Sequence, residues 1–128
     1  MSGNKGLIDS NVIIDASKGI ISIQRILEEY DFLYTSLISY VETLGFKFSD
    51  NEEYEIVKQI LNSIEIVDLN KEIADIAIEY RKKKKIKLPD ALVLATSKYL
   101  KADLITSDVM DFHNVDKSIK IIHPVILK

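Results

Sequence analysis

Four acidic residues, Asp9, Glu42, Asp90 and Asp108, lie in separate segments of the chain, each at or near an expected end of a strand or helix. A fifth, Asp111, follows three residues after Asp108. Crowded carboxylates repel one another, so either some stay protonated or a multivalent cation neutralises them. Sites built only from Asp and Glu oxygens suit Mg²⁺ or Mn²⁺. If the acids converge, we expect a metal site that activates water for phosphodiester hydrolysis.

Each acid also has an ordinary explanation. Asp90 can stabilise the start of its helix, Asp108 can cap a turn, Asp9 can precede a cap and Glu42 can be a partly exposed helix residue. The functional interpretation therefore depends on all of them meeting at one place. We assign no site role to the remaining helical acids, which are expected on solvated faces, nor to Asp15.

Polar residues beside these acids are candidates for holding an attacking water or a phosphate oxygen by hydrogen bonds: Ser10, Asn11, Thr106 and Ser107. Two of them, Ser10 and Asn11, are also good helix caps.

A basic stretch, RKKKKIK at 81–87, holds six of the 17 basic residues, although the net charge of the chain is −3. The rest of the chain is therefore acidic. Two interpretations stay open: solvation of a helix end whose carbonyl terminus favours cations, or contact with an anionic partner. In the second case the contacts are Lys82, Lys83, Lys84, Lys85 and Lys87.

Short apolar segments predict five strands, at 6–9, 32–35, 64–67, 102–106 and 119–122. Helical periodicity and cap signals predict a short helix closed by Gly19 and helices at 20–30, 37–44, 52–63, 71–85 and 89–100. Strands separated by helices indicate an α/β fold, a three-layer sandwich around a mostly parallel five-stranded sheet. In such sheets ligands bind beyond the carboxyl ends of the strands, which is where Asp9 and Asp108 are expected.

The same periodicity predicts which side chains face the core. Pro89 is expected as the first residue of its helix, with Asp90 in the first turn. Glu42 is expected at the border of the core. Two helices are expected to bury Ile20, Ile23, Ile26 and Leu27 in one, and Leu37, Ile38, Val41 and Leu44 in the other.

Length and composition narrow the possible classes. The chain has 128 residues, is 47% hydrophobic, and contains no cysteine and two histidines. One domain spanning 1–128 is expected, without disulfides, thiolate chemistry or sulfur-ligated zinc. Neither a membrane span nor a signal peptide is recognisable, so a cytoplasmic protein is expected.

The sequence resembles the VapC-like toxin ribonucleases of the PIN-domain family. Three segments carry the resemblance: LIDSNVIID at the start, then TSLISYVETLG, and finally LPDALVLATSKYLKADLITSDVMDF. In that family the acid after the first strand corresponds to Asp9, the helix glutamate to Glu42, the helix-opening acid to Asp90 and the acid after the fourth strand to Asp108. Asp111 matches a position that is acidic in many members and auxiliary.

The resemblance implies an endoribonuclease that depends on Mg²⁺ or Mn²⁺ and acts on RNA. It also implies a homodimer that a small antitoxin protein neutralises. Under this interpretation, metal binding falls to Asp9, Asp90, Asp108 and Asp111, and Glu42 joins Asp9, Asp90 and Asp108 in catalysis.

Two other functions remain open. A non-catalytic PIN module would bind RNA or protein through the basic stretch and apolar helices. A phosphoacceptor receiver domain is also a small α/β sandwich, but it requires paired acids after the first strand and a lysine after the fifth. Here the first strand is followed by Asp9 alone, and His123 precedes Pro124 where the lysine is expected.

Overall fold

A five-stranded sheet forms the centre of the protein in the computed structural model, which describes residues 3–126. All neighbouring strands are parallel, in the order β3-β2-β1-β4-β5. The predicted α/β fold is confirmed, and the sheet is parallel throughout. The strands are β1 Lys5–Ile8, β2 Phe32–Ser36, β3 Glu65–Val67, β4 Asp103–Ile105 and β5 Ile121–Ile122.

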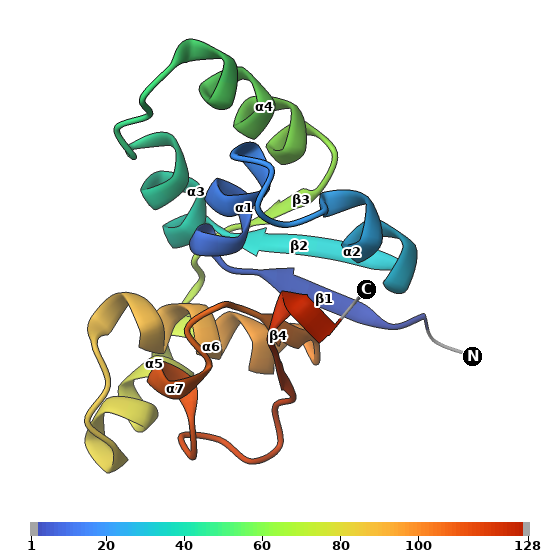
Figure 1. Ribbon diagram of the computed structural model, residues 1–128. Coiled ribbons are helices and arrows are strands. Elements are labelled where there is room, and N and C mark those ends of the chain that lie inside the picture. Colours follow the sequence, from blue (N-terminus) through green and yellow to red (C-terminus); the bar gives the residue numbers. More distant parts are fainter. Residues whose placement is uncertain (1–2, 127–128) are drawn as a thin grey trace.

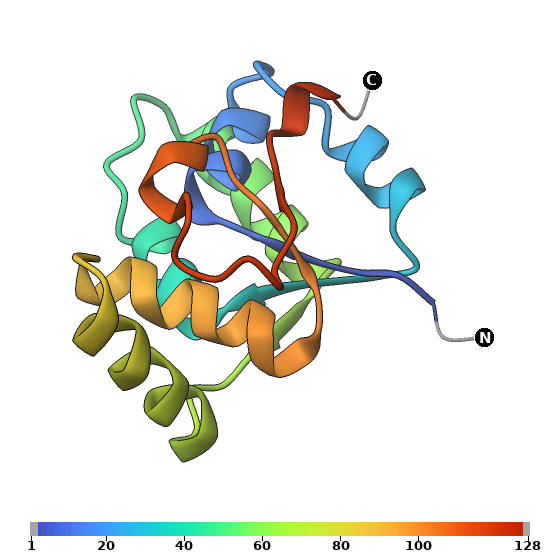
Figure 2. The same ribbon diagram turned by 90° about the horizontal axis from the view of Figure 1, so that it is seen from below.

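Helices cover both faces of this sheet (Figures 1 and 2). Within residues 3–126, none of them is long and apolar enough to cross a membrane. They are α1 Ser10–Ser17, α2 Ile23–Glu29, α3 Leu37–Leu44, α4 Asn51–Asn62, α5 Lys71–Lys83, α6 Leu88–Leu100 and α7 Val109–Phe112, followed by a short 3₁₀ helix, Pro124–Ile126.

Two apolar clusters fill the space between the sheet and its helices. Successive residues of a strand point to opposite faces, so Leu7 and Ile8 of β1 enter different clusters. Leu7 packs with Ile73 of α5 and Leu94 of α6, whereas Ile8 packs with side chains of α1, α2 and α4. This is the expected three-layer sandwich (Figure 1).

The end of β1 is held firmly between its neighbours. The Thr35 hydroxyl donates to the Ile8 carbonyl at 2.7 Å, and the Asp9 N–H donates to the Ile105 carbonyl at 2.9 Å. A Cβ at Gly6 would lie 3.0 Å from side-chain atoms of both Leu33 and Ile105. The close packing around Gly6 and these hydrogen bonds fix the backbone from which Asp9 projects.

Helix α6 is buried over the continuous stretch 91–97, as its apolar sequence predicts. The helix begins at Leu88, so Pro89 is its second residue and not its first. Asp90 lies in the first turn as predicted. Because α6 packs on the sheet, its first turn lies at a fixed place relative to the strand ends.

Two predictions of buried residues are wrong. Ile20 is 68% exposed because α2 begins only at Ile23, after the Ser22 cap, so Ile20 lies in the preceding loop. Val41 is 61% exposed because α3 buries Ser39 and Thr43 in its place. The Thr43 hydroxyl donates to the Ser39 carbonyl at 2.6 Å, and a hydroxyl satisfied by its own helix can be buried without penalty.

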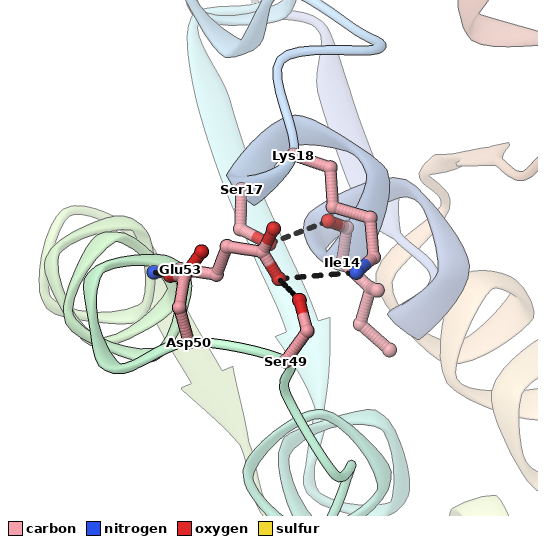
Figure 3. Close-up of polar contacts among 6 residues, drawn as sticks. All are labelled: Ile14, Ser17, Lys18, Ser49, Asp50 and Glu53. Atoms are coloured by element: carbon pink, nitrogen blue, oxygen red, sulfur yellow. Dashed lines mark hydrogen bonds and ion pairs between the residues drawn. The ribbon is translucent and has the colours of Figure 1, made fainter.

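A polar contact joins α1 to α4 (Figure 3). Lys18, directly after α1, pairs with Glu53 of α4 at 3.1 Å, and the Ser49 hydroxyl donates to the same carboxylate oxygen at 3.4 Å. Asp50 caps α4 by accepting the Glu53 N–H at 2.8 Å. These contacts hold the loop after α3 against the end of α1.

The strand order decides against the receiver-domain alternative. Receiver domains have the order β2-β1-β3-β4-β5, in which β1 lies between β2 and β3. In this protein β1 lies between β2 and β4, and β3 is an edge strand. The receiver interpretation is therefore wrong.

Candidate active site

Asp9 follows β1 directly and is the N-cap residue of α1. Its side chain is only 6% exposed. One carboxylate oxygen accepts the Ser10 N–H at 2.9 Å, and the other accepts the Thr106 hydroxyl at 2.8 Å. The cap is therefore Asp9 itself, and the assignment of Ser10 or Asn11 as the cap is wrong.

The Asn11 amide joins the segment after β1 to the turn after β4. Its nitrogen donates to Asp108 at 2.9 Å and lies 3.3 Å from an oxygen of Asp9. Its oxygen accepts the Ser107 N–H at 3.1 Å. The neutral Asn11 amide thus lies between two carboxylates and donates to both. This reduces the electrostatic repulsion between Asp9 and Asp108.

Glu42 reaches the same edge of the sheet from α3. It is exposed, and it accepts the Ser10 hydroxyl at 3.1 Å. Ser10 follows Asp9, so this hydrogen bond ties α3 to the residue beside the buried carboxylate. The expectation that Glu42 borders the core is wrong, because α3 buries Ser39 and Thr43 and leaves Glu42 exposed.

Asp90 is influenced electrostatically by the other acids. Burial raises the pKa of Asp90, and the charges of Asp111, Glu42 and Asp108 raise it further, whereas the nearby Lys87 ammonium opposes them. Asp111 belongs to the first turn of α7, three residues after Asp108. The first turn of α6 thus lies within electrostatic range of acids from α3, α7 and the turn after β4.

Burial also raises the pKa of Asp9, to about 6. Hydrogen bonds from Thr106 and Ser10 oppose this shift because they favour the charged form, and the charges of Glu42 and Asp90 add to it. The excess negative potential around Asp9 is what a cation would neutralise.

The oxygen-only set of side chains fits a hard divalent cation that keeps part of its water shell. Within residues 3–126, no three His, Cys, Asp or Glu side chains approach closely enough to enclose an ion directly. Mg²⁺ and Mn²⁺ are usually bound through one or two carboxylates with water and substrate oxygens completing the shell. The arrangement therefore fits an open, hydrated ion and not a closed protein cage.

The four polar residues expected to hold water or phosphate act differently. Thr106 is fully buried, and its hydroxyl donates to Asp9, so it orients the carboxylate and the expected contact with substrate is wrong. Ser10 is bonded to Glu42, and Asn11 joins Asp9 to Asp108. The Ser107 hydroxyl is buried and has no hydrogen-bond partner in the described part of the chain.

Sequence reasoning missed the linking role of Asn11. Its spacing, two residues after Asp9 at the start of a helix, indicates only that its amide lies near the Asp9 carboxylate. Its partners there, Ser107 and Asp108, are 96 and 97 residues away. No local pattern predicts such a pairing.

The basic stretch lies at the end of α5 and in the loop before α6. Residues 81–85 and Lys87 are all exposed. Lys82 pairs with Glu79 at 3.7 Å, and Lys87 is close enough to Asp90 to lower its pKa. The stretch therefore extends to the edge of the acidic cluster.

Comparison with known proteins identifies the family. The PIN domain family model matches residues 6–118. The chain belongs to the PIN domain family. A curated relative named ribonuclease VapC2, from Methanocaldococcus jannaschii, is 28% identical over an alignment of 137 positions, gaps included, which covers 91% of this chain and 92% of the relative.

Solved structures agree with the PIN assignment. A toxin-antitoxin complex from Klebsiella pneumoniae contains a chain that is 27% identical, with a TM-score of 0.74 and coverage of 91% of this chain and 99% of that one. The DNA-bound VapBC complex from Salmonella typhimurium aligns with a TM-score of 0.77 at 16% identity, covering 92% of this PIN chain and 96% of that one. At that identity the second likeness shows the fold alone.

The raised pKa of Asp9 predicts a pH-dependent stability. Its folded-state pKa of about 6 exceeds the reference value of 3.8, so between these values the folded protein binds more protons and loses stability as pH rises. We expect Asp9→Asn to increase the free energy of unfolding at pH 8 by about 1 to 3 kcal/mol, and this gain to shrink as pH falls towards 4. Urea denaturation across this pH range measures it.

Asp75→Asn is the matched control, because Asp75 is exposed on α5 and loses the same charge. Its stability should follow that of the wild type to within about 0.5 kcal/mol, because the exposed pair of Asp75 with Lys71 contributes little. Parallel curves for Asp9→Asn and the wild type would contradict the assigned burial of charge at Asp9.

Proposed function

We propose that this PIN protein is a divalent-metal-dependent endoribonuclease, the toxin of a toxin-antitoxin pair, acting in the cytoplasm as one domain. The main support is the buried Asp9 carboxylate, on which acids from α3 and α6 exert their charge and which Asn11 connects to Asp108 in the turn after β4. The relatives named for ribonuclease activity and toxin-antitoxin complexes support the same proposal.

The residues divide into two roles under this proposal. Mg²⁺ or Mn²⁺ would be held among Asp9, Asp90, Asp108 and Asp111, by one or two of these carboxylates directly and by the others through water. When bound, the ion supplies neutralisation of phosphate charge and a lowered pKa for water. Ser10, Asn11 and Thr106 orient the carboxylates, so the site is organised before the ion and the RNA bind.

Glu42 is the proposed general base of this reaction. Its carboxylate is exposed and held from one side by the Ser10 hydroxyl, which leaves its second oxygen as a proton acceptor. A carboxylate within hydrogen-bond reach of an attacking water can act as a general base. Asp9, Asp90 and Asp108 would contribute to catalysis by holding the cation that neutralises the charge of the phosphate.

We expect Asp9→Asn to lower the rate of RNA cleavage by about 100-fold or more, since it removes a carboxylate from the proposed metal site. The measurement is cleavage of a mixed RNA substrate with Mg²⁺ or Mn²⁺, with and without a chelator. Wild-type activity should disappear with the chelator and return with added metal.

Asp75→Asn again serves as the control and should cleave at the wild-type rate. Cleavage that resists the chelator, or full activity of Asp9→Asn, would refute metal catalysis by these residues. A wild-type protein that binds RNA without cutting it would instead support the non-catalytic alternative.

The basic stretch is proposed to hold the RNA backbone next to the acids. Replacing Lys83, Lys84 and Lys85 together by Gln should raise KM about tenfold and reduce the slope of log affinity against log salt by about 2, since each phosphate contact contributes roughly 0.7 for single strands. Fluorescence anisotropy with labelled RNA at several salt concentrations measures the slope.

A second triple variant, with Lys58, Lys101 and Lys120 replaced by Gln, removes the same charge from other exposed positions. This variant should retain most of the slope of log affinity against log salt concentration. Equal effects of the two triple variants would favour helix-end solvation over RNA contact.

The proposed protein partners are a second copy of the chain and a small antitoxin. Support for the homodimer is a groove of about 370 Å³ between α5 and α6, beside the half-exposed side chains Ile78 and Leu88. Exposed apolar surface of this kind is typical of protein interfaces. Support for the antitoxin is the likeness to the Klebsiella complex.

Sedimentation velocity is expected to give twice the mass of the chain, and Ile78→Glu should return it to the monomer, because a carboxylate would be buried in the interface. Leu69→Glu, at an equally apolar exposed position elsewhere, is the control. A monomeric wild type would contradict the homodimer.

The antitoxin proposal predicts that a small protein encoded beside this one forms a larger species with it in sedimentation velocity and suppresses RNA cleavage.

A further inference from the structure

A pocket of about 610 Å³ opens at Ser107, the residue before Asp108, between the segment that joins α1 to α2 and the 3₁₀ helix Pro124–Ile126. Figure 2 shows these two segments side by side, although they are about a hundred residues apart in the chain. The volume is within the range of pockets that hold small ligands, ~300 to 1,000 Å³. The pocket is therefore large enough for a nucleoside.

Its walls are apolar and face solvent. Ile20 and Ile21 form one side, and Pro124 and Val125 form the other. Ile20 is 68% and Val125 50% exposed, so the sequence leaves large aliphatic side chains in water at this place. Two facing apolar walls suit a flat ring that is buried between them.

Polar groups with complementary functions also line the pocket. Asp15 offers an acceptor and Arg25 offers donors. The Val125 N–H donates to His123 Nδ1 at 3.1 Å, so in the neutral ring the proton is on Nε2, which is a donor. Acceptor and donor groups around apolar walls match the edge of a nucleobase, which carries both.

Ser107 connects this pocket to the candidate active site. It lines the pocket, and its backbone N–H donates to Asn11, the residue that holds Asp9 and Asp108. Its hydroxyl is buried without a partner among residues 3–126. A ligand in the pocket would thus contact the residue that connects the pocket to Asn11 and Asp108.

We propose that this pocket binds one unpaired base of the RNA, next to the phosphate that is cleaved, and that it sets a base preference at that position. The proposal rests on the proposed function. The Asp15 carboxylate disfavours a phosphate inside the pocket, so the base enters it and the backbone passes between Arg25 and the acids. Bases of single-stranded RNA are the ones available for such readout.

The first experiment compares the wild type with the double variant Ile20→Ser, Val125→Ser on an RNA library with randomised positions, with the cut ends sequenced. Both side chains are at least half exposed, so folding should be kept, and circular dichroism checks it. The preference at one nucleotide position should fall by about tenfold, the size expected for lost pocket contacts, while cleavage itself persists. Leu69→Ser, an exposed apolar side chain outside the pocket, should keep the preference.

The second experiment needs no catalysis. Tetranucleotides of A, C, G or U are titrated into Asp9→Asn protein, and backbone amide shifts are followed by NMR. Amide shifts at 20–25 and at 123, 125 and 126 that are larger for one base support the pocket, even if the wild type never cleaves RNA and the proposed function fails. If RNA is cleaved with an unchanged preference and no shift appears at these residues, the pocket proposal is overturned. If the shifts at these residues change with protein concentration in the absence of RNA, a second copy of the chain occupies the pocket, and the pocket proposal is overturned.

Discussion

Electrostatic repulsion among carboxylates gathered at one edge of a sheet is the constraint on which the rest of this structure depends. Asp9 is almost fully buried there, and burial raises its pKa to about 6. The fold tolerates this cost because the backbone at the end of β1 is fixed on both sides and because Thr106, Ser10 and Asn11 donate to the carboxylate. Hydrogen-bond donors that are already in place lower the cost of bringing the charges together, and a cation would lower it further.

The distribution of charge over the molecule follows from this constraint. The acids collect where parallel strands end, whereas six basic residues follow one another at the end of α5 and before α6. Lys87 connects the two regions, since its ammonium lowers the pKa of Asp90. An acidic centre beside a basic stretch is an arrangement that holds a polyanion while a cation compensates the repulsion at the centre. The apolar pocket on the other side of Ser107 adds a surface that charge alone does not provide.

Membership of the PIN domain family and the solved relatives agree on the fold, but a fold hosts chemistry only through its site. In this protein the polar residues around Asp9 hold the carboxylates of the site in position. Each of Ser10, Asn11 and Thr106 is bonded to a carboxylate, so their side chains organise the acids before any substrate arrives. Preorganised groups of this kind need little rearrangement during a reaction.

The sequence alone determined the α/β class, the parallel sheet and the helix that presents Asp90, because strand and helix periods, caps and proline act locally. It could not determine which faces of α3 are buried, since Ser39 and Thr43 satisfy their hydroxyls and take the inward places expected for Val41. It also could not determine that Asn11 meets Asp108, or that Ile20 faces Val125 across a pocket. These pairings join segments about a hundred residues apart, and only the packing of the strands and helices brings them together.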